Sequence, residues 1–121
     1  MIDTVHDLTV VILAAGEGKR MRSRQPKVLH PLCGRPLIAY PLRAAQALAD
    51  RFVVVAPSDT PSLRAALTDD VRMVEQRERL GTGHAVLQAK DECGEGTILV
   101  LPSDMPLVSA ETLERLVAHH R

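Results

Sequence analysis

Residues 10–27 read VVILAAGEGKRMRSRQPK, and this stretch joins two chemically different halves. The first half belongs to an apolar, β-branched run from Leu8 to Ala14, which is typical of a strand buried on both faces of a sheet. The second half contains Gly16 and Gly18 and is then crowded with Lys and Arg. The stretch therefore predicts a central strand that leads into a long loop, from Ala15 to Pro36, with at most one short turn.

Beyond this loop, apolar strand patterns alternate with helical patterns. Further strands are predicted at 51–56, 71–75 and 97–101, and helices at 37–48, 60–67, 82–89 and 109–119. Such alternation implies parallel strands joined by right-handed crossovers. The chain is therefore predicted to be α/β, with a Rossmann-like, three-layer α/β/α arrangement and a mostly parallel sheet in the strand order 3-2-1-4.

The composition of the 121 residues excludes several classes of partner. Lys plus Arg equals Asp plus Glu at 15 each, so no overall basic field attracts nucleic acid, and aromatic residues at 2% cannot form stacking platforms. No apolar run approaches the ~18 residues of a membrane span. The two isolated thiols, Cys33 and Cys93, are expected to be small buried hydrophobes in a reducing compartment. We therefore expect a cytoplasmic protein without nucleic-acid or membrane partners.

The loop after the first strand has the composition of an anion site. Five cations lie between Lys19 and Lys27, and Glu17 is the only acid nearby. Glycines let backbone N–H groups approach a ligand, Arg gives bidentate contacts to phosphate, and Lys gives a point charge. Neither the dinucleotide fingerprint nor the P-loop motif is complete here, and a solvated surface loop remains the alternative. The residue types favour a triphosphate or pyrophosphate.

Asp104 follows the predicted strand at 97–101. The strand order reverses between this strand and the first one, so Asp104 is expected to face the loop that ends at Lys27. A carboxylate beside phosphates is a suitable Mg²⁺ ligand. The alternative is an aspartate that caps a turn before Pro106.

Gln76 and the turn LGTGHA at 80–85 form a third candidate. The Gln amide offers both a donor and an acceptor, which can match the edge of a pyrimidine, and a glycine-rich turn permits close approach to a flat base. A tight turn with a helix cap is the alternative interpretation. We interpret His84 as a packing or hydrogen-bonding histidine.

Three stretches together resemble a known family: LAAGEGKRM at 13–21, PKVLHPLCGRP at 26–36 and QRERLGTGHAV at 76–86. They are similar to the uridylyltransferase half of the bifunctional N-acetylglucosamine-1-phosphate uridyltransferases, which also carry a glucosamine-1-phosphate acetyltransferase half, within the broader MobA-like NTP transferase superfamily. The first two stretches are shared with many nucleotidyltransferases, whereas LGTGHA is more specific to the amino-sugar enzymes. The resemblance covers nearly the whole chain.

The resemblance implies roles for individual residues. Arg20 and Lys27 would hold the triphosphate and stabilise charge at the reacting phosphorus. Gln76, Gly81 and Thr82 would recognise uracil and its ribose. Asp104 would bind Mg²⁺. The residues along the nucleotide would be Leu13, Ala14, Ala15, Gly16 and Gly18.

The resemblance also implies a reaction, in which UMP passes from UTP to N-acetylglucosamine 1-phosphate with release of pyrophosphate. The product, UDP-N-acetylglucosamine, feeds peptidoglycan synthesis. Residues 1–121 would form the nucleotide-binding portion of a truncated nucleotidyltransferase fold, without the sugar-binding half or the acetyltransferase domain. We therefore expect little turnover from these residues alone. The alternatives are a nucleotide-binding module without turnover and a MobA-like relative with another base or acceptor.

The predicted strand at 97–101, TILVL, is expected to form an edge of the sheet. An apolar, uncharged edge strand invites pairing with another chain. The sequence therefore predicts self-association into a homo-oligomer.

Overall fold

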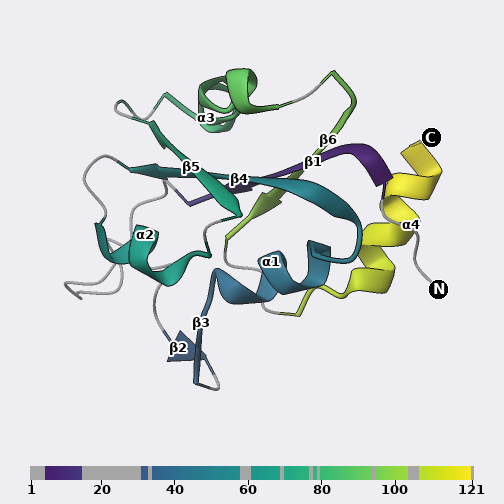
Figure 1. Cartoon of the computed structure of the whole chain (residues 1–121), viewed down its shortest axis with the longest axis horizontal. Helices are drawn as coiled ribbons and strands as arrows, with labels where there is room; N and C mark the ends of the chain where they lie inside the picture. The colour runs from purple at the N-terminus through teal and green to yellow at the C-terminus, as the bar shows by residue number, and fades with distance from the viewer. Residues whose placement is uncertain are drawn as a thin grey trace.

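A computed structural model of the chain describes residues 5–14, 31–32, 34–57, 61–68, 70–76, 78, 80–93, 95–103 and 107–120. Its centre is a four-stranded sheet (Figure 1) made of β1 (Val5–Leu13), β4 (Ala49–Pro57), β5 (Val71–Gln76) and β6 (Thr97–Pro102). The sheet order is β5-β4-β1-β6, and all three pairings are parallel. This is the predicted order 3-2-1-4, which is confirmed.

The central strand β1 is buried on both faces, as its continuous apolar run predicts. Val10 and Ile12 belong to the larger core cluster on one face of the sheet, and Val11 belongs to the smaller cluster on the other. All three side chains are fully buried. Alternation along the strand sends successive side chains to opposite faces, so a run in which Thr9 is the only polar residue requires cover on both sides.

Helices supply that cover and complete three layers. Figure 1 shows α1 (Ala39–Ala45) and α2 (Pro61–Ala66) on one side of the sheet and α3 (Thr82–Gln88) on the other. The short 3-10 helix η3 (Lys90–Glu92) follows α3. The last helix, α4 (Ala110–His120), lies beside α1. The larger cluster includes residues of α1, α2 and α4. In the smaller cluster, Ala85 and Ala89 pack against valines of β1 and β4. The predicted α/β/α arrangement is confirmed.

The start of α4 shows how the sequence fixes a helix boundary. The backbone N–H of Thr112 donates to the Ser109 hydroxyl at 3.1 Å, as an N-cap requires. Glu111 lies in the first turn, and His119 and His120 lie in the last, so the charges follow the helix dipole. The predicted helix from Ser109 onward is confirmed.

Two local predictions were wrong. The end of the stretch predicted to be a loop, 15–36, contains a small antiparallel hairpin, β2 (Pro31–Leu32) with β3 (Arg35–Pro36). Its strands are too short for a periodic pattern, and the turn depends on Gly34 at a φ of 81°. The helix predicted at 37–48 ends earlier, at Ala45. The Leu48 N–H bonds to the Ala45 carbonyl three residues back, because the chain tightens there before it enters β4.

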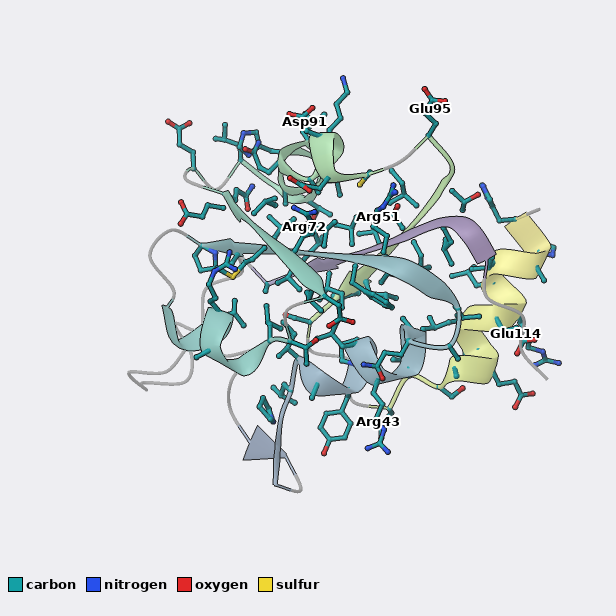
Figure 2. All side chains as sticks on the ribbon, in the orientation of Figure 1. Arg43, Arg51, Arg72, Asp91, Glu95 and Glu114 are labelled. Atoms are coloured by element: carbon teal, nitrogen blue, oxygen red, sulfur yellow. The ribbon has the colours of Figure 1, made fainter. Side chains whose placement is uncertain are left out.

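Charged side chains lie around the outside of the molecule (Figure 2), among them Arg43, Asp91 and Glu95, all of which are exposed. In the part of the chain that the structure describes, no helix is long and apolar enough to cross a membrane.

Cys93 is partly buried against the smaller core cluster. Burial raises the pKa of its thiol, Arg51 partly opposes that shift, and Glu92 reinforces it. The expectation of a buried, small hydrophobe is therefore met in part at this position. Cys33 lies outside the described residues.

Candidate functional site

The carboxyl ends of the parallel strands create one functional edge of the sheet. The strand register pairs Leu13 of β1 with Pro102 of β6, and Pro57 of β4 with Gln76 of β5. Two further bonds hold the chain as it leaves this edge: Ala14 N–H donates to Val55 O at 2.8 Å, and Ser103 N–H donates to Leu13 O at 3.2 Å. The loops that follow β1 and β6 therefore depart from adjacent positions, where the strand order reverses.

Two predicted nucleotide-binding residues occupy this edge. Leu13 is the last residue of β1 and is half-buried, and Ala14 follows it as a buried residue. Ser103 is buried beside them, held by its bond to Leu13. The remaining predicted residues of the phosphate loop lie outside the described residues, and their roles stay predictions: Ala15, Gly16, Gly18, Arg20 and Lys27.

The predicted Mg²⁺ ligand, Asp104, also lies outside the described residues. Within the described ranges, no group of three or more His, Cys, Asp or Glu side chains could hold a metal ion. The Mg²⁺ site thus stays a prediction, placed by the sequence one residue after Ser103.

Gln76 lies at the same carboxyl edge, at the end of β5. It is only 5% exposed, although it is polar. Its amide nitrogen, Nε2, lies 3.4 Å from the Gly81 carbonyl oxygen and 3.0 Å from Nδ1 of His84. The structure therefore brings together Gln76 and the LGTGHA turn, which the sequence selected as one candidate.

The Gly81 turn has a shape that other residues resist. Gly81 has a φ of 100°, directly before α3, and its carbonyl accepts the Ala85 N–H at 3.1 Å. A side chain at such a φ strains the backbone. Thr82 follows as the exposed first residue of α3. Glycine at position 81 thus places both the Thr82 side chain and the carbonyl that Gln76 contacts.

Sequence reasoning did not select Gln88. Its Nε2 lies 3.3 Å from Nε2 of His84 and 3.2 Å from the His84 carbonyl oxygen. His84 and Gln88 are four residues apart on α3, a spacing that places side chains on one helix face and could have signalled the contact. A cleft of about 240 Å³ lies beside the pair, lined by Glu75, Glu78, His84 and Gln88.

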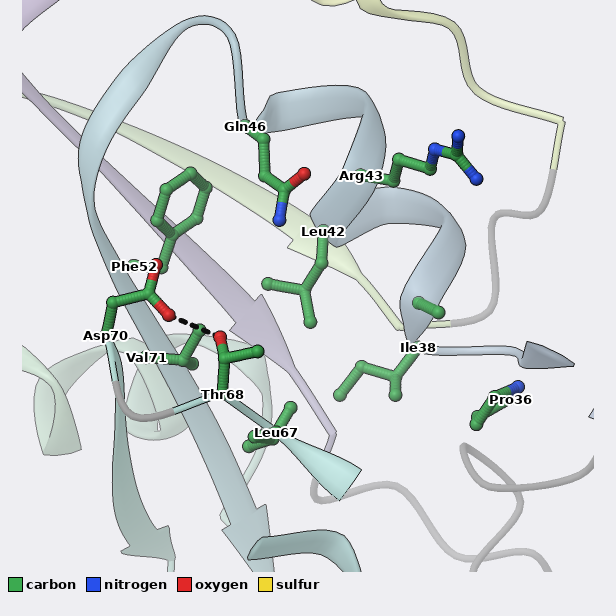
Figure 3. Close-up of a pocket in the computed structure, with 11 residues that line it drawn as sticks. Pro36, Ile38, Leu42, Arg43, Gln46, Phe52, Leu67, Thr68, Asp70 and Val71 are labelled. Atoms are coloured by element: carbon green, nitrogen blue, oxygen red, sulfur yellow. Dashed lines mark hydrogen bonds between the residues drawn. The ribbon is translucent and has the colours of Figure 1, made fainter. Parts of the chain in front are cut away.

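A second cavity, of about 250 Å³, lies away from this edge (Figure 3). Phe52 and Val71, which pair near the amino ends of β4 and β5, contribute to its apolar lining together with Leu42 of α1. Thr68 donates a hydrogen bond to the Asp70 carboxylate at its rim. The predicted site residues that the structure describes, which are Leu13, Ala14, Gln76, Gly81 and Thr82, do not line this cavity.

Known proteins share both the sequence and the fold. The chain is 45% identical over 115 residues to the bifunctional protein GlmU of Alkaliphilus oremlandii, which covers 94% of this chain and 25% of that protein. It is 51% identical over 113 residues to bifunctional protein GlmU of Xylella fastidiosa strain 9a5c, with 90% of this chain and 25% of that protein covered. The chain thus spans about a quarter of the length of these curated relatives.

A solved structure shows the fold. UDP-glucose pyrophosphorylase from Acinetobacter baumanii superposes with a TM-score of 0.80 at 24% identity, covering 99% of this chain and 53% of that one. At this identity the likeness shows the fold alone. The MobA-like NTP transferase domain matches residues 10–121, from the central strand to the last residue of the chain. The chain belongs to the family of MobA-like NTP transferase domains.

Proposed function

We propose that the chain is the nucleotide-binding portion of a uridylyltransferase that transfers UMP from UTP to N-acetylglucosamine 1-phosphate. The observation that carries the proposal is its identity of 45–51% to bifunctional GlmU proteins along 90–94% of its length. The geometry supports it, because Leu13, Ala14 and Gln76 all lie at the carboxyl edge of the sheet, where open α/β sheets bind ligands.

The base would bind at the end of β5. Gln76 would meet the uracil edge, and Gly81 and Thr82 would contact the base and its ribose. The carbonyl of Gly81 is already engaged with Gln76, so the turn and the amide form one unit. The edge continues across β4 to β1, where Leu13 and Ala14 directly precede the loop that would bind the phosphates.

The phosphates would bind at the loop after β1. Arg20 and Lys27 would neutralise the triphosphate, with Ala15, Gly16 and Gly18 allowing close approach of the backbone. An oxygen of the sugar 1-phosphate attacks the α-phosphorus of UTP and forms a new P–O bond. The bond from that phosphorus to the α,β-bridging oxygen breaks, and pyrophosphate leaves with the electron pair. The nucleophile is already an anion, so the chain contributes positioning and charge neutralisation.

Asp104 would hold Mg²⁺ together with phosphate oxygens. A single carboxylate beside phosphates is a donor set that Mg²⁺ accepts. The bond from Ser103 to Leu13 supports this, because it keeps the exit of β6 beside the exit of β1. The ion would supply positive charge at the reacting phosphate.

The alternative is nucleotide binding without turnover, or another base or acceptor. The observation behind it is length, since the chain spans about a quarter of its curated relatives. We therefore expect binding of UTP with little release of pyrophosphate from the 121 residues.

Calorimetry with UTP and Mg²⁺, followed by a coupled assay for pyrophosphate in the presence of N-acetylglucosamine 1-phosphate, tests the proposal. We expect UTP binding that Lys27→Ala abolishes and that Lys90→Ala, at an exposed lysine of η3, leaves unchanged. Tighter binding of CTP would point to another MobA-like relative. Rapid release of pyrophosphate would refute the expectation of little turnover from the 121 residues. Absence of binding to any nucleotide would refute the proposal.

A further inference from the structure

The contacts of Gln76 fix which of its amide atoms faces the protein. The Gly81 carbonyl oxygen can only accept a hydrogen bond, so the Gln76 atom 3.4 Å away must be the donor, Nε2. The same Nε2 lies 3.0 Å from Nδ1 of His84. Nδ1 must therefore accept, and a neutral His84 ring then carries its hydrogen on Nε2.

This arrangement leaves the Gln76 oxygen for a ligand. Both hydrogens of Nε2 are used by Gly81 and His84. The oxygen, Oε1, has no hydrogen-bond partner among the residues that the structure describes, although Gln76 is only 5% exposed. Buried polar atoms are nearly always hydrogen-bonded, so Oε1 calls for a partner that donates.

We propose that His84 is a positioning residue: its Nδ1 holds the Gln76 amide so that Oε1 is presented to an N–H donor on the nucleobase. The inference rests on the proposed function and extends it to base selectivity. The ring nitrogen N3 of uracil carries a hydrogen and is such a donor. The corresponding nitrogen of cytosine carries none and is an acceptor, which a fixed Oε1 disfavours.

His84 is the stronger of the two restraints. The contact between Gln76 and Gly81, at 3.4 Å, lies at the long end of hydrogen-bond distances, whereas that to His84 is close to the preferred length. Without an acceptor at residue 84, the amide can turn and present Nε2 to cytosine. Loss of His84 therefore relaxes the choice between UTP and CTP.

Gln88 sits on the other side of the ring. Its Nε2 lies 3.3 Å from Nε2 of His84, and two donors would oppose each other there. The same Gln88 Nε2 lies 3.2 Å from the His84 carbonyl oxygen, which can only accept, so the amide keeps its nitrogen on this side. The 3.3 Å contact is then not a hydrogen bond when the ring hydrogen is on Nε2, and the shorter 3.0 Å contact of Nδ1 with Gln76 assigns the tautomer.

The tautomer of His84 gives a direct test. Long-range ¹H–¹⁵N spectra of the ¹⁵N-labelled chain at about pH 8.5 separate the two forms of the neutral ring. The chain has five histidines, and the spectrum of His84→Asn identifies the signal that belongs to position 84. We expect the hydrogen on Nε2. A ring with its hydrogen on Nδ1 would overturn the inference, whatever the chain binds.

Two variants test the effect on the ligand. His84→Asn keeps an acceptor at the position of Nδ1, whereas His84→Leu removes it. We expect His84→Leu to lose about tenfold in UTP affinity and most of its preference for UTP over CTP, and His84→Asn to retain both. An unchanged preference in His84→Leu would refute the positioning role. Failure of the unaltered chain to bind either nucleotide would instead refute the proposed function, and the tautomer would still decide the geometry at His84.

Discussion

At the scale of a single residue, burial against the core lowers the reactivity of the Cys93 thiol. Cys93 has a raised pKa because burial opposes the charged thiolate. Its folded value lies above its unfolded value, so the thiol contributes stability that is present below the unfolded pKa and is lost as the pH rises through the folded one. The thiolate is the reactive form, and folding reduces its fraction.

We therefore expect iodoacetamide to alkylate Cys93 at about pH 8 several-fold more slowly in the folded chain than in the urea-unfolded chain. A Cys33→Ser background isolates the signal, and mass spectrometry of quenched samples gives the rates. Equal rates in the two states would show that the fold does not protect this thiol.

The candidate residues could be chosen from the sequence, but their contacts could not. The amide of Gln76, with its donor and acceptor beside a glycine-rich turn, marks this residue in the sequence, and its place at the carboxyl edge follows from the strand order. Its bond to His84 spans eight residues through a turn, and no periodicity fixes that distance. The positive φ of Gly81 shapes this turn, and the neighbouring residue types do not predict that angle.

At the scale of elements, two nearby glycines, Gly81 in the turn before α3 and Gly83 inside that helix, have different structural roles. Gly81 has a φ of 100°, whereas Gly83 lies within α3 and has no positive φ. An added Cβ would meet no atom within 4 Å at either position. The two positions therefore differ in backbone conformation and not in available space.

We expect Gly81→Ala to destabilise the fold by about 1–3 kcal/mol, because a φ of 100° with a ψ of 177° is a conformation that Ala resists. Its matched control, Gly83→Ala, should be neutral or stabilising by up to about 0.5 kcal/mol, since Ala favours a helix. Urea unfolding followed by circular dichroism measures both changes. Equal effects of the two substitutions would contradict the account of the turn.

Elements with long patterns were predicted well, and short ones were not. The buried strands β1 and β4 and the capped helix α4 carry signals over six residues or more. The hairpin of β2 and β3 has two residues per strand, and two prolines occupy its ends. Prolines normally argue against a strand, and here they are tolerated because the hairpin lies outside the main sheet.

At the scale of the whole molecule, the two edges of the sheet differ in charge. The β5 edge carries Arg72 and Glu75, which protect an edge from pairing. The β6 edge, TILVLP, carries no charge, and Ile98 and Val100 are 41% and 38% exposed. In the described part of the chain, no strand pairs with the outer side of β6.

We propose that copies of the chain associate through β6. Light scattering after size-exclusion chromatography should show dimers or larger species, which Val100→Lys reduces to monomers. Leu116→Lys is the control, because it removes an exposed apolar side chain from α4 and leaves the edge unchanged. A monomeric unaltered chain at high concentration would contradict the prediction.

The central claim is that the carboxyl edge of the sheet binds the nucleotide, and an NMR titration with UTP and Mg²⁺ tests it most directly. We predict that amide signals shift at Leu13, Ala14, Gln76 and Thr82, all at that edge. Signals of the separate cavity, such as those of Leu42 and Phe52, should stay in place. Shifts confined to that cavity, or no shifts at the edge at saturating UTP, would contradict the account.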